Sequence, residues 1–287
     1  MTGFLLQVGG PLQSWGEHSA FNDRDTVAHP TRSGLIGMVA AALGIPRHEA
    51  APAPAADGTP TSFERLGHLR FTIRHDRPGT RLRDFQTVGG GLPAHRTVPT
   101  AKGGRRGAGQ TTIVSHRHYL ADAVFTIAVT APHAPDPARL LQECADALAA
   151  PHWPPYLGRR SCPPNAPFLL AARRDDPLAD LRTSLPLARP RTSGSTVQVR
   201  FTADAPFSPT DAGPGATADP LSARGVITSL NDDPVRLTPH DRVYRTRSSY
   251  STTRTFPVDL CAGYGSDYLD ALLAYLGTTT TPQDVSA

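Results

Sequence analysis

Two adjacent arginines and a hydroxyl group follow a glycine in the middle of the chain. The segment Arg159-Arg160-Ser161-Cys162 comes directly after Gly158 and before two prolines. Guanidinium groups bind phosphate oxygens through paired hydrogen bonds, and glycine and proline hold such a turn in one shape. The segment therefore predicts a phosphate-binding turn. Cys162 beside two cations is also a candidate nucleophile, but no base accompanies it, which favours binding over catalysis.

A second candidate site is the segment His116-Arg117-His118-Tyr119. Side chains two apart on an extended strand share a face, so both imidazoles could reach one phosphate as general base and acid. The simpler interpretation, which we favour, is that the segment only contacts phosphate. The two histidines also suit a metal by spacing, but no third ligand lies nearby. We therefore expect no metal and no cofactor.

Positive charge is concentrated in residues 61–120. This stretch has eleven Lys and Arg, three Asp and Glu, and five His, although the net charge of the whole chain is only +4. It contains a glycine-rich run at 103–109. A nucleotide-binding loop would follow an apolar strand and end in a Lys-Ser or Lys-Thr pair, and this run does neither, so it is not such a loop. A local basic excess favours a polyanionic partner, and we expect nucleic acid rather than a merely solvated basic surface.

Composition excludes several other classes of protein. The 29 prolines and 25 glycines exclude a helical bundle or coiled coil. Three widely spaced cysteines without a CxxC pair exclude a disulfide framework and a zinc ribbon. The longest apolar run, residues 35–45, is too short to cross a membrane, and the first residues do not resemble a signal peptide. We expect a cytoplasmic protein with free thiols and no membrane partner.

Apolar patterns predict the elements that position these residues. Strands are expected at 4–8, 69–75, 123–130, 168–172 and 197–202, and helices at 33–44, where Ser33 can form the cap, and after Asp136. Residues 76–118 lack a core pattern and predict a long hairpin or loop. This order predicts an α+β fold of the ferredoxin-like type, in which a four-stranded antiparallel sheet carries two helices on one face.

The chain is expected to divide at its proline- and glycine-rich stretch. We predict one domain over residues 1–202, a linker over 203–225 and a C-terminal extension of unknown role over 226–287. The extension includes a basic segment at 242–250 and a helix at 267–276. Trp15 follows the first strand and is predicted either to join the core or to stack on a base.

Five separated blocks carry a resemblance to a known family. The blocks are GGPLQSWG at 9–16, HPTRSGLIGMVAAALGI at 29–45, RDFQTV at 83–88, YLADAVF at 119–125 and YLGRRSCPP at 156–164. In this order and spacing they resemble the Cas-five family of CRISPR-associated proteins, in particular its type I-E Cascade branch. The resemblance covers residues 1–175. It implies a RAMP-type RNA-binding protein with a ferredoxin-like (RRM/RAMP-type) domain and a β-hairpin thumb at about 83–117.

The resemblance also implies a function. It implies a non-catalytic subunit of Cascade, an antiviral RNA-guided complex. This subunit caps the five-prime handle of CRISPR RNA, contacts the backbone RAMP subunit and the large subunit, and meets target DNA through the complex. The RNA-binding residues that it implies are Gln13, Trp15, Arg32 and Ser33, then Arg83, Thr87, Lys102, Arg105, Arg106 and Arg117 in the thumb, and Arg159, Arg160, Ser161 and Cys162.

Two other functions stay open at this point. Some members of the wider family resemble metal-independent endoribonucleases that process precursor CRISPR RNA, and His116, His118 and Tyr119 are the candidate catalytic residues for that activity. A stand-alone binder of single-stranded RNA is the third interpretation, but such a protein would not need so large a thumb.

Overall fold

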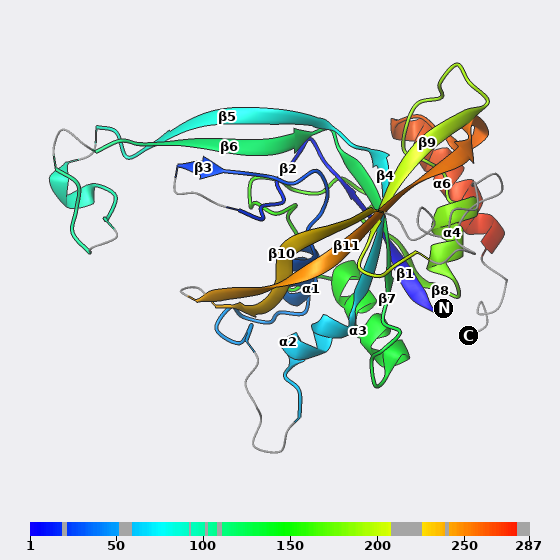
Figure 1. Cartoon of the computed structure of the whole chain (residues 1–287), viewed down its shortest axis with the longest axis horizontal. Coiled ribbons are helices and arrows are strands. Elements are labelled where there is room, and N and C mark those ends of the chain that lie inside the picture. The colour runs from blue at the N-terminus through cyan, green and yellow to red at the C-terminus, as the bar shows by residue number, and fades with distance from the viewer. Residues whose placement is uncertain are drawn as a thin grey trace.

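The computed structural model describes residues 1–18, 22–51, 59–91, 93–100, 103–107, 111–207, 226–238 and 241–279. Its main feature is an antiparallel sheet in the order β10-β11-β9-β4-β7-β1-β8 (Figure 1). The strands are β1 (Gly3–Gly9), β4 (Arg70–Arg77), β7 (Val124–Thr130), β8 (Leu169–Arg174), β9 (Thr196–Ala203), β10 (Val226–Leu237) and β11 (Arg242–Pro257). The helices are α1 (Arg32–Ala42), α2 (Ser62–Arg65), α3 (Pro137–Ala149), α4 (Pro177–Thr183) and α6 (Gly265–Thr279), with 3-10 turns at Leu66–His68, Ala94–Arg96 and Val258–Leu260.

The predicted strands and helices are confirmed, but the prediction of a four-stranded sheet is wrong. Strands β4, β7, β1 and β8 lie next to one another, as the predicted order requires. The sheet continues past β4, because β9 pairs with β4 and β11 pairs with β9 from Tyr250↔Ala203 to Pro257↔Thr196. Strand β10 completes the seven. The C-terminal residues therefore widen the sheet.

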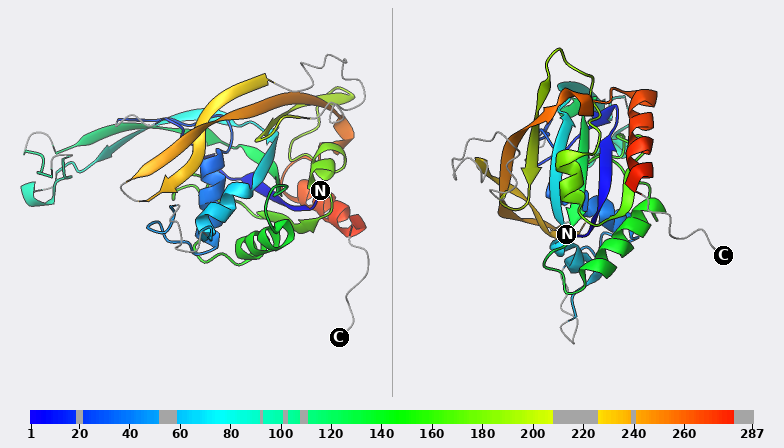
Figure 2. Two further views of the ribbon diagram at one scale, coloured as in Figure 1. Left: turned by 60° about the horizontal axis from the view of Figure 1, so that its bottom comes forward. Right: turned by 90° about the vertical axis from the view of Figure 1, so that its right-hand side faces the viewer.

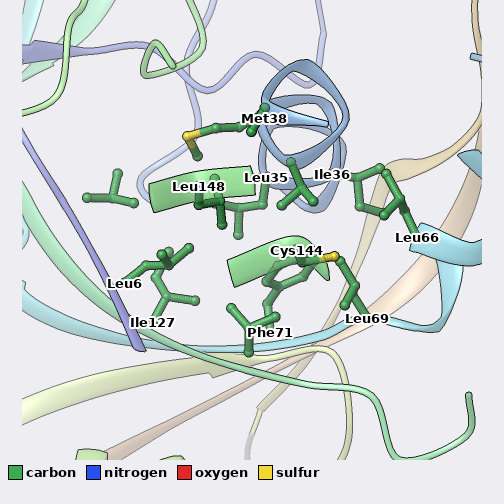
Figure 3. Close-up of a cluster of buried hydrophobic side chains, with 14 of the residues drawn as sticks. Leu6, Leu35, Ile36, Met38, Leu66, Leu69, Phe71, Ile127, Cys144 and Leu148 are labelled. Atoms are coloured by element: carbon green, nitrogen blue, oxygen red, sulfur yellow. The ribbon is translucent and has the colours of Figure 1, made fainter. Parts of the chain in front are cut away.

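The helices pack on both faces of the sheet, not on one as predicted. Alternate residues of β1 point to opposite faces. Leu6 lies in a core with Leu35 of α1 and Leu148 of α3 (Figure 3). Leu5 lies in a second core with Leu181 of α4 and Leu272 of α6. All seven residues of β1 are buried as a result.

The predicted excursion is a hairpin in a second sheet. Strands β5 (Thr80–Val88) and β6 (Ile113–Ala121) pair in register from Thr80↔Ala121 to Val88↔Ile113. The short strands β2 (Leu12–Gln13) and β3 (Asp23–Arg24) pair with β6, β2 antiparallel and β3 parallel. Figures 1 and 2 show the β5–β6 hairpin reaching far beyond the seven-stranded sheet. We call β5, β6 and the segment between them the long hairpin.

Helix α1 begins one residue before the predicted cap. The cap is Thr31 rather than Ser33: its hydroxyl accepts a hydrogen bond from the N–H of Gly34 over 3.3 Å. Asp136 caps α3 as the sequence indicates. All three cysteines are buried and free, which confirms the prediction of free thiols.

Some predictions fall on residues that the structure does not describe. The predicted linker at 203–225 lies mostly outside the described residues, and so does Lys102. Within the described ranges, no helix is long and apolar enough to span a membrane. In the same part of the chain, no cluster of three His, Cys, Asp or Glu side chains could hold a metal ion.

Candidate RNA-binding groove

A groove of about 1180 Å³ lies beside the first turns of α1. Its lining comes from the segment after β2, from helix α1 and the segment after it, from α2, from the loop at 153–163, and from the β10–β11 hairpin. Basic and aromatic side chains predominate among its polar and large residues. The lining arginines are Arg24, Arg47, Arg159, Arg160 and Arg242, and the aromatic residues include Trp153, Tyr156 and Tyr244.

The acidic residues of the groove already have partners. Glu17 accepts a hydrogen bond from the N–H of Asn231 over 2.9 Å. Asp25 accepts one from the N–H of Thr26 and lies 3.6 Å from a guanidinium nitrogen of Arg81. By contrast, the side chains of Arg47, Arg160 and Arg242 have no hydrogen bond or ion pair within the described part of the chain. The groove therefore carries a net positive charge that is free for an anionic ligand.

The turn at 157–162 has a shape that only glycine permits. The N–H of Leu157 donates to the carbonyl of Cys162 over 2.7 Å, which closes the turn. Gly158 has a φ of +81°, and a Cβ there would lie 1.7 Å from the carbonyl oxygen of Ser14. The N–H of Ser14 also donates to the carbonyl of Leu157 over 3.1 Å, so the turn is fixed against the segment after β2.

The turn presents its two arginines differently. Arg160 and Ser161 are exposed. The Arg159 guanidinium lies 4.7 Å from the centre of the Tyr119 ring, and one of its terminal nitrogens donates to the carbonyl of Arg24 over 3.0 Å. The other terminal nitrogen is buried and has no hydrogen-bond partner within the described residues. Both arginines line the groove, but only Arg160 is exposed, and the Arg159 guanidinium is held in place by its neighbours.

Cys162 does not face the groove. Its side chain is 1% exposed and belongs to the core around α1. Burial raises the pKa of its thiol, which disfavours the thiolate that a nucleophile or a charged contact would need. The possible nucleophile is therefore a core residue, and the implied RNA contact through its side chain is not available in this structure.

Gln13 and Trp15 are buried beneath the groove. The amide of Gln13 donates to the carbonyls of Val8 and Ala123, and its oxygen accepts from the indole N–H of Trp15 over 3.0 Å. Trp15 is 1% exposed and packs in the core. The structure therefore supports the core interpretation of Trp15, and its ring is not accessible to a base. Trp15 lines the groove, and Gln13 holds the indole of Trp15 in place.

Arg32 is also used within the protein, which corrects the implied RNA contact. Its guanidinium donates to the carboxylates of Asp204 and Asp233, and to the carbonyls of Gly67 and Leu69. Four of its five donors are thereby used, and the side chain is 4% exposed. Its partners come from segments far along the chain, which the sequence alone could not show. Its neighbour Ser33 lines the groove and is half-buried.

The predicted thumb residues lie on the long hairpin, apart from the groove lining. Arg83 and Thr87 are exposed and share one face of the hairpin, opposite His118 and Val114 on β6. Arg117 pairs with Asp84 in the register and lies on the other face. Arg105 is exposed and donates to the carbonyl of Thr97 over 2.6 Å, and Arg106 is half-buried. Lys102 lies outside the described residues.

The three candidate catalytic residues do not converge. His118 Nε2 lies 3.1 Å from Asp23, and its Nδ1 is buried without a partner among the described residues. The His116 ring lies 5.6 Å from that of Phe85. Tyr119 is 4% exposed and points to the opposite face of β6 from both histidines. The three groups therefore cannot act together on one phosphate in this structure.

Several groove residues carry no signal in the sequence that points to RNA binding. Arg24 and Arg47 are isolated cations that carry no local pattern, so no sequence signal identified them. Arg242 and Tyr244 belong to the basic segment at 242–250, to which the sequence assigns no role. Tyr156 directly precedes the predicted turn, and Trp153 lies three residues earlier.

The chain is similar to known CRISPR-associated proteins. The family model described as CRISPR-associated protein (Cas_Cas5) matches residues 3–248. The CRISPR system Cascade subunit CasD of Escherichia coli (strain K12) is 35% identical over 175 residues, which cover 60% of this chain and 72% of that protein.

Two solved structures are also similar. A chain of a CRISPR RNA-guided surveillance complex is 43% identical, with a TM-score of 0.77 over 96% of this chain and 99% of that one. A crystal structure of a Cas protein, at 24% identity and a TM-score of 0.55, shares the fold over 92% of this chain and 99% of that one. With a family model that spans residues 3–248, the chain belongs to the Cas5 family of CRISPR-associated proteins.

Proposed function

We propose that this protein is a non-catalytic subunit of Cascade, the CRISPR RNA-guided surveillance complex, and that its groove binds the five-prime handle of the CRISPR RNA. The observation that carries the proposal is the groove itself, in which five arginines face two acids that already have partners. Single-stranded RNA presents one phosphate per nucleotide, and such a basic groove suits its backbone. The likeness to a surveillance-complex chain supports the same function.

Within the groove, the turn at 157–162 is the main phosphate-binding element. Arg160 and Ser161 are exposed and can donate to phosphate oxygens, and Arg159 lies beside them in a turn that a main-chain hydrogen bond closes. Arg24, Arg47 and Ser33 add donors along the same groove. Gln13, Trp15 and Cys162 support these residues from below, and Arg32 fixes the start of α1.

The fold that carries the groove is a ferredoxin-like unit in this proposal. Strands β8, β1, β7 and β4 with helices α1 and α3 have the βαββαβ order of that unit. Residues 1–202 form the RNA-binding domain, and residues 226–287 extend its sheet by the strands β10 and β11. We place the protein in the cytoplasm, where the RNA and its partners are made.

The long hairpin is the thumb in this proposal, and it contacts the backbone RAMP subunit and the guide RNA. The residues proposed to contact RNA from the hairpin are Arg83, Thr87 and Arg117 on its two strands and Lys102, Arg105 and Arg106 in the segment between them. Leu82, Phe85 and Val88 leave between 44% and 60% of their surface exposed on β5, which suits a protein partner. In this proposal the protein also contacts the large subunit of the complex. It contacts target DNA only as part of the assembled complex.

Charge reversal in the turn tests the groove assignment. Arg159→Glu with Arg160→Glu should weaken binding of labelled CRISPR-repeat RNA at least about tenfold, because two charge-assisted contacts are lost. The slope of log affinity against log salt should also fall by about 1.4. The matched control is Arg173→Glu with Arg200→Glu, two exposed arginines on β8 and β9 that do not line the groove. Equal effects of the two variants at an unchanged melting temperature would refute the groove as the binding site.

Shortening the long hairpin tests the thumb assignment. We expect replacement of residues 89–109 by a short Gly-Ser loop to leave a folded protein that no longer co-purifies with the other Cascade subunits. The replaced segment contributes little to the two cores, so its loss should cost little stability. Co-purification at the level of the unaltered protein would contradict the thumb assignment.

A further inference from the structure

The C-terminal hairpin forms part of the groove that holds Arg159 and Arg160. Asn231 and Leu237 of β10 and Arg242 and Tyr244 of β11 line this groove. The register pairs Leu237 with Arg242 and Pro234 with Tyr244. Arg242 and Tyr244 are two residues apart on one strand, so both side chains project from the same face of β11.

We propose that the β10–β11 hairpin is a wall of the RNA-binding groove, where Arg242 binds a phosphate and Tyr244 contacts the adjoining ribose or base. This inference rests on the proposed function, and it gives residues 226–257 a role in RNA recognition.

Buried charges hold the hairpin against α1 from its inner side. Asp232 accepts hydrogen bonds from the main-chain N–H of Arg32 over 2.7 Å and from Arg247 over 2.6 and 3.0 Å. Asp233 accepts from the Arg32 guanidinium over 2.8 Å, and Asp204 lies 3.1 Å from Arg247. Breaking such a buried set is costly, so the hairpin is held in a fixed place.

Main-chain bonds at two further points fix the same hairpin to the groove. The N–H of Asn231 donates to Glu17 over 2.9 Å, and the N–H of Leu237 donates to the carbonyl of Ala50 over 2.7 Å. Glu17 and Ala50 both line the groove. The face that carries Arg242 is therefore positioned before any ligand binds, which lowers the cost of binding.

The charges of the hairpin distinguish Arg242 from its neighbours. Arg236 pairs with Asp241, Arg245 with Asp233, and Arg247 with Asp232 and Asp204. Arg242 has no acidic partner within the described residues, and it is the arginine of these four that lines the groove. An unpaired guanidinium beside a half-buried tyrosine provides a cation for a phosphate and a flat ring for a sugar or base.

Two neutral substitutions on one strand test the inference. Arg242→Gln and Arg245→Gln remove the same charge, but residue 245 projects from the opposite face of β11. With labelled CRISPR-repeat RNA and the purified full chain, we expect Arg242→Gln to weaken binding about fivefold or more. The salt slope should also fall by about 0.7, the value for one phosphate contact on a single strand. Arg245→Gln should stay within about twofold of the unaltered protein, and Tyr244→Ala should weaken binding without changing the salt slope.

The remaining outcomes separate this inference from the proposed function. Arg160→Gln serves as the reference for the rest of the groove. If Arg160→Gln weakens binding and Arg242→Gln does not, the role proposed for the hairpin is wrong and the groove is still the RNA-binding site. If neither weakens binding, both proposals are wrong. Equal losses for Arg242→Gln and Arg245→Gln would show a general charge effect and overturn the inference. So would an Arg242→Gln variant that keeps its RNA affinity but no longer co-purifies with the other subunits, because the hairpin would then face a protein.

Discussion

The main-chain N–H of Arg32 donates a hydrogen bond to the carboxylate of Asp232 over 2.7 Å, which ties the first turn of α1 to a strand 200 residues away. The N-terminus of a helix attracts anions through its unpaired N–H groups and its dipole. The family resemblance implies RNA contacts at Arg32 and Ser33, at the start of this helix. In the structure, a carboxylate of the protein itself occupies it and also pairs with Arg247.

We predict that Asp232→Asn lowers the free energy of unfolding by about 3 kcal/mol, because it removes one partner from a buried ion pair. Asp232 is 1% exposed, so water cannot replace the lost charge. Chemical denaturation monitored by circular dichroism measures the change. The control is Asp241→Asn, whose pair with Arg236 is exposed, and its effect should stay below about 1 kcal/mol. Equal losses of unfolding free energy in the two variants would show that the buried pair stabilises the protein no more than the exposed pair does.

Gly158→Ala should destabilise the protein by at least about 2 kcal/mol, since a side chain is strained at positive φ and its Cβ would collide with Ser14. RNA binding should weaken as well, because the turn that carries Arg159 and Arg160 must move. The control is Gly37→Ala in α1, where an added Cβ meets nothing within 4 Å. That variant should gain up to about 1 kcal/mol from better helix propensity. A stable Gly158→Ala protein with normal RNA affinity would contradict the assigned geometry of the turn.

The elements that the sequence predicted correctly are those with a strong local pattern. The strand at 69–75 alternates in polarity, and the helix after Asp136 has both a cap and a periodic apolar face, so each carries its own signal. The width of the sheet has no local signal. Residues 226–257 join it because β11 pairs with β9 across about fifty residues of chain, and pairing at that distance is not visible in composition.

The site was predictable where its residues are consecutive. Arg159 to Ser161 form one turn, and the structure places that turn at the groove. The family resemblance implies an RNA contact at Arg32, but its partners Asp204 and Asp233 lie about 170 and 200 residues away. Arg24, Arg47 and Arg242 come together only through the fold, so sequence patterns could not group them.

Acid should destabilise the protein through His75. Burial first, and then the charges of His29 and Arg200, lower the pKa of His75 from 6.5 to about 3. The folded chain then binds fewer protons than the unfolded chain, so stability is complete above about pH 6.5 and falls as the pH drops towards 3. The loss approaches about 1.4 kcal/mol per pH unit for this one group. Burial also lowers the pKa of His29, which adds a loss in the same direction.

Urea denaturation at pH 7.5 and pH 5.5 measures this dependence. His75→Gln should lose less stability between the two pH values than the unaltered protein, whatever its stability at pH 7.5. His48→Gln is the control, because His48 is 77% exposed. The assignment fails if His75→Gln and the unaltered protein show the same loss between the two pH values.

We predict that the purified protein does not cleave CRISPR-repeat RNA in EDTA. A metal-independent ribonuclease needs a base and an acid within hydrogen-bond reach, about 2.6–3.2 Å, of the reacting oxygens. His118 is engaged with Asp23 through one ring nitrogen, and its other ring nitrogen is buried. Tyr119 is buried under Arg159 on the opposite face of β6. His116 alone is left accessible beside Phe85, and one imidazole cannot serve as base and acid in a single step.

The experiment incubates end-labelled repeat RNA with the purified protein and, in parallel, with a His116→Ala, His118→Ala double variant. Both should leave the RNA intact over hours at a protein concentration that saturates binding. A contaminating nuclease would cut the RNA equally in the two samples, so equal cleavage does not count against the prediction. Cleavage at one position by the unaltered protein that the double variant loses would contradict it. Such a result would require His118 to leave Asp23 when RNA binds, and Asp23→Asn should then increase the rate by freeing the imidazole.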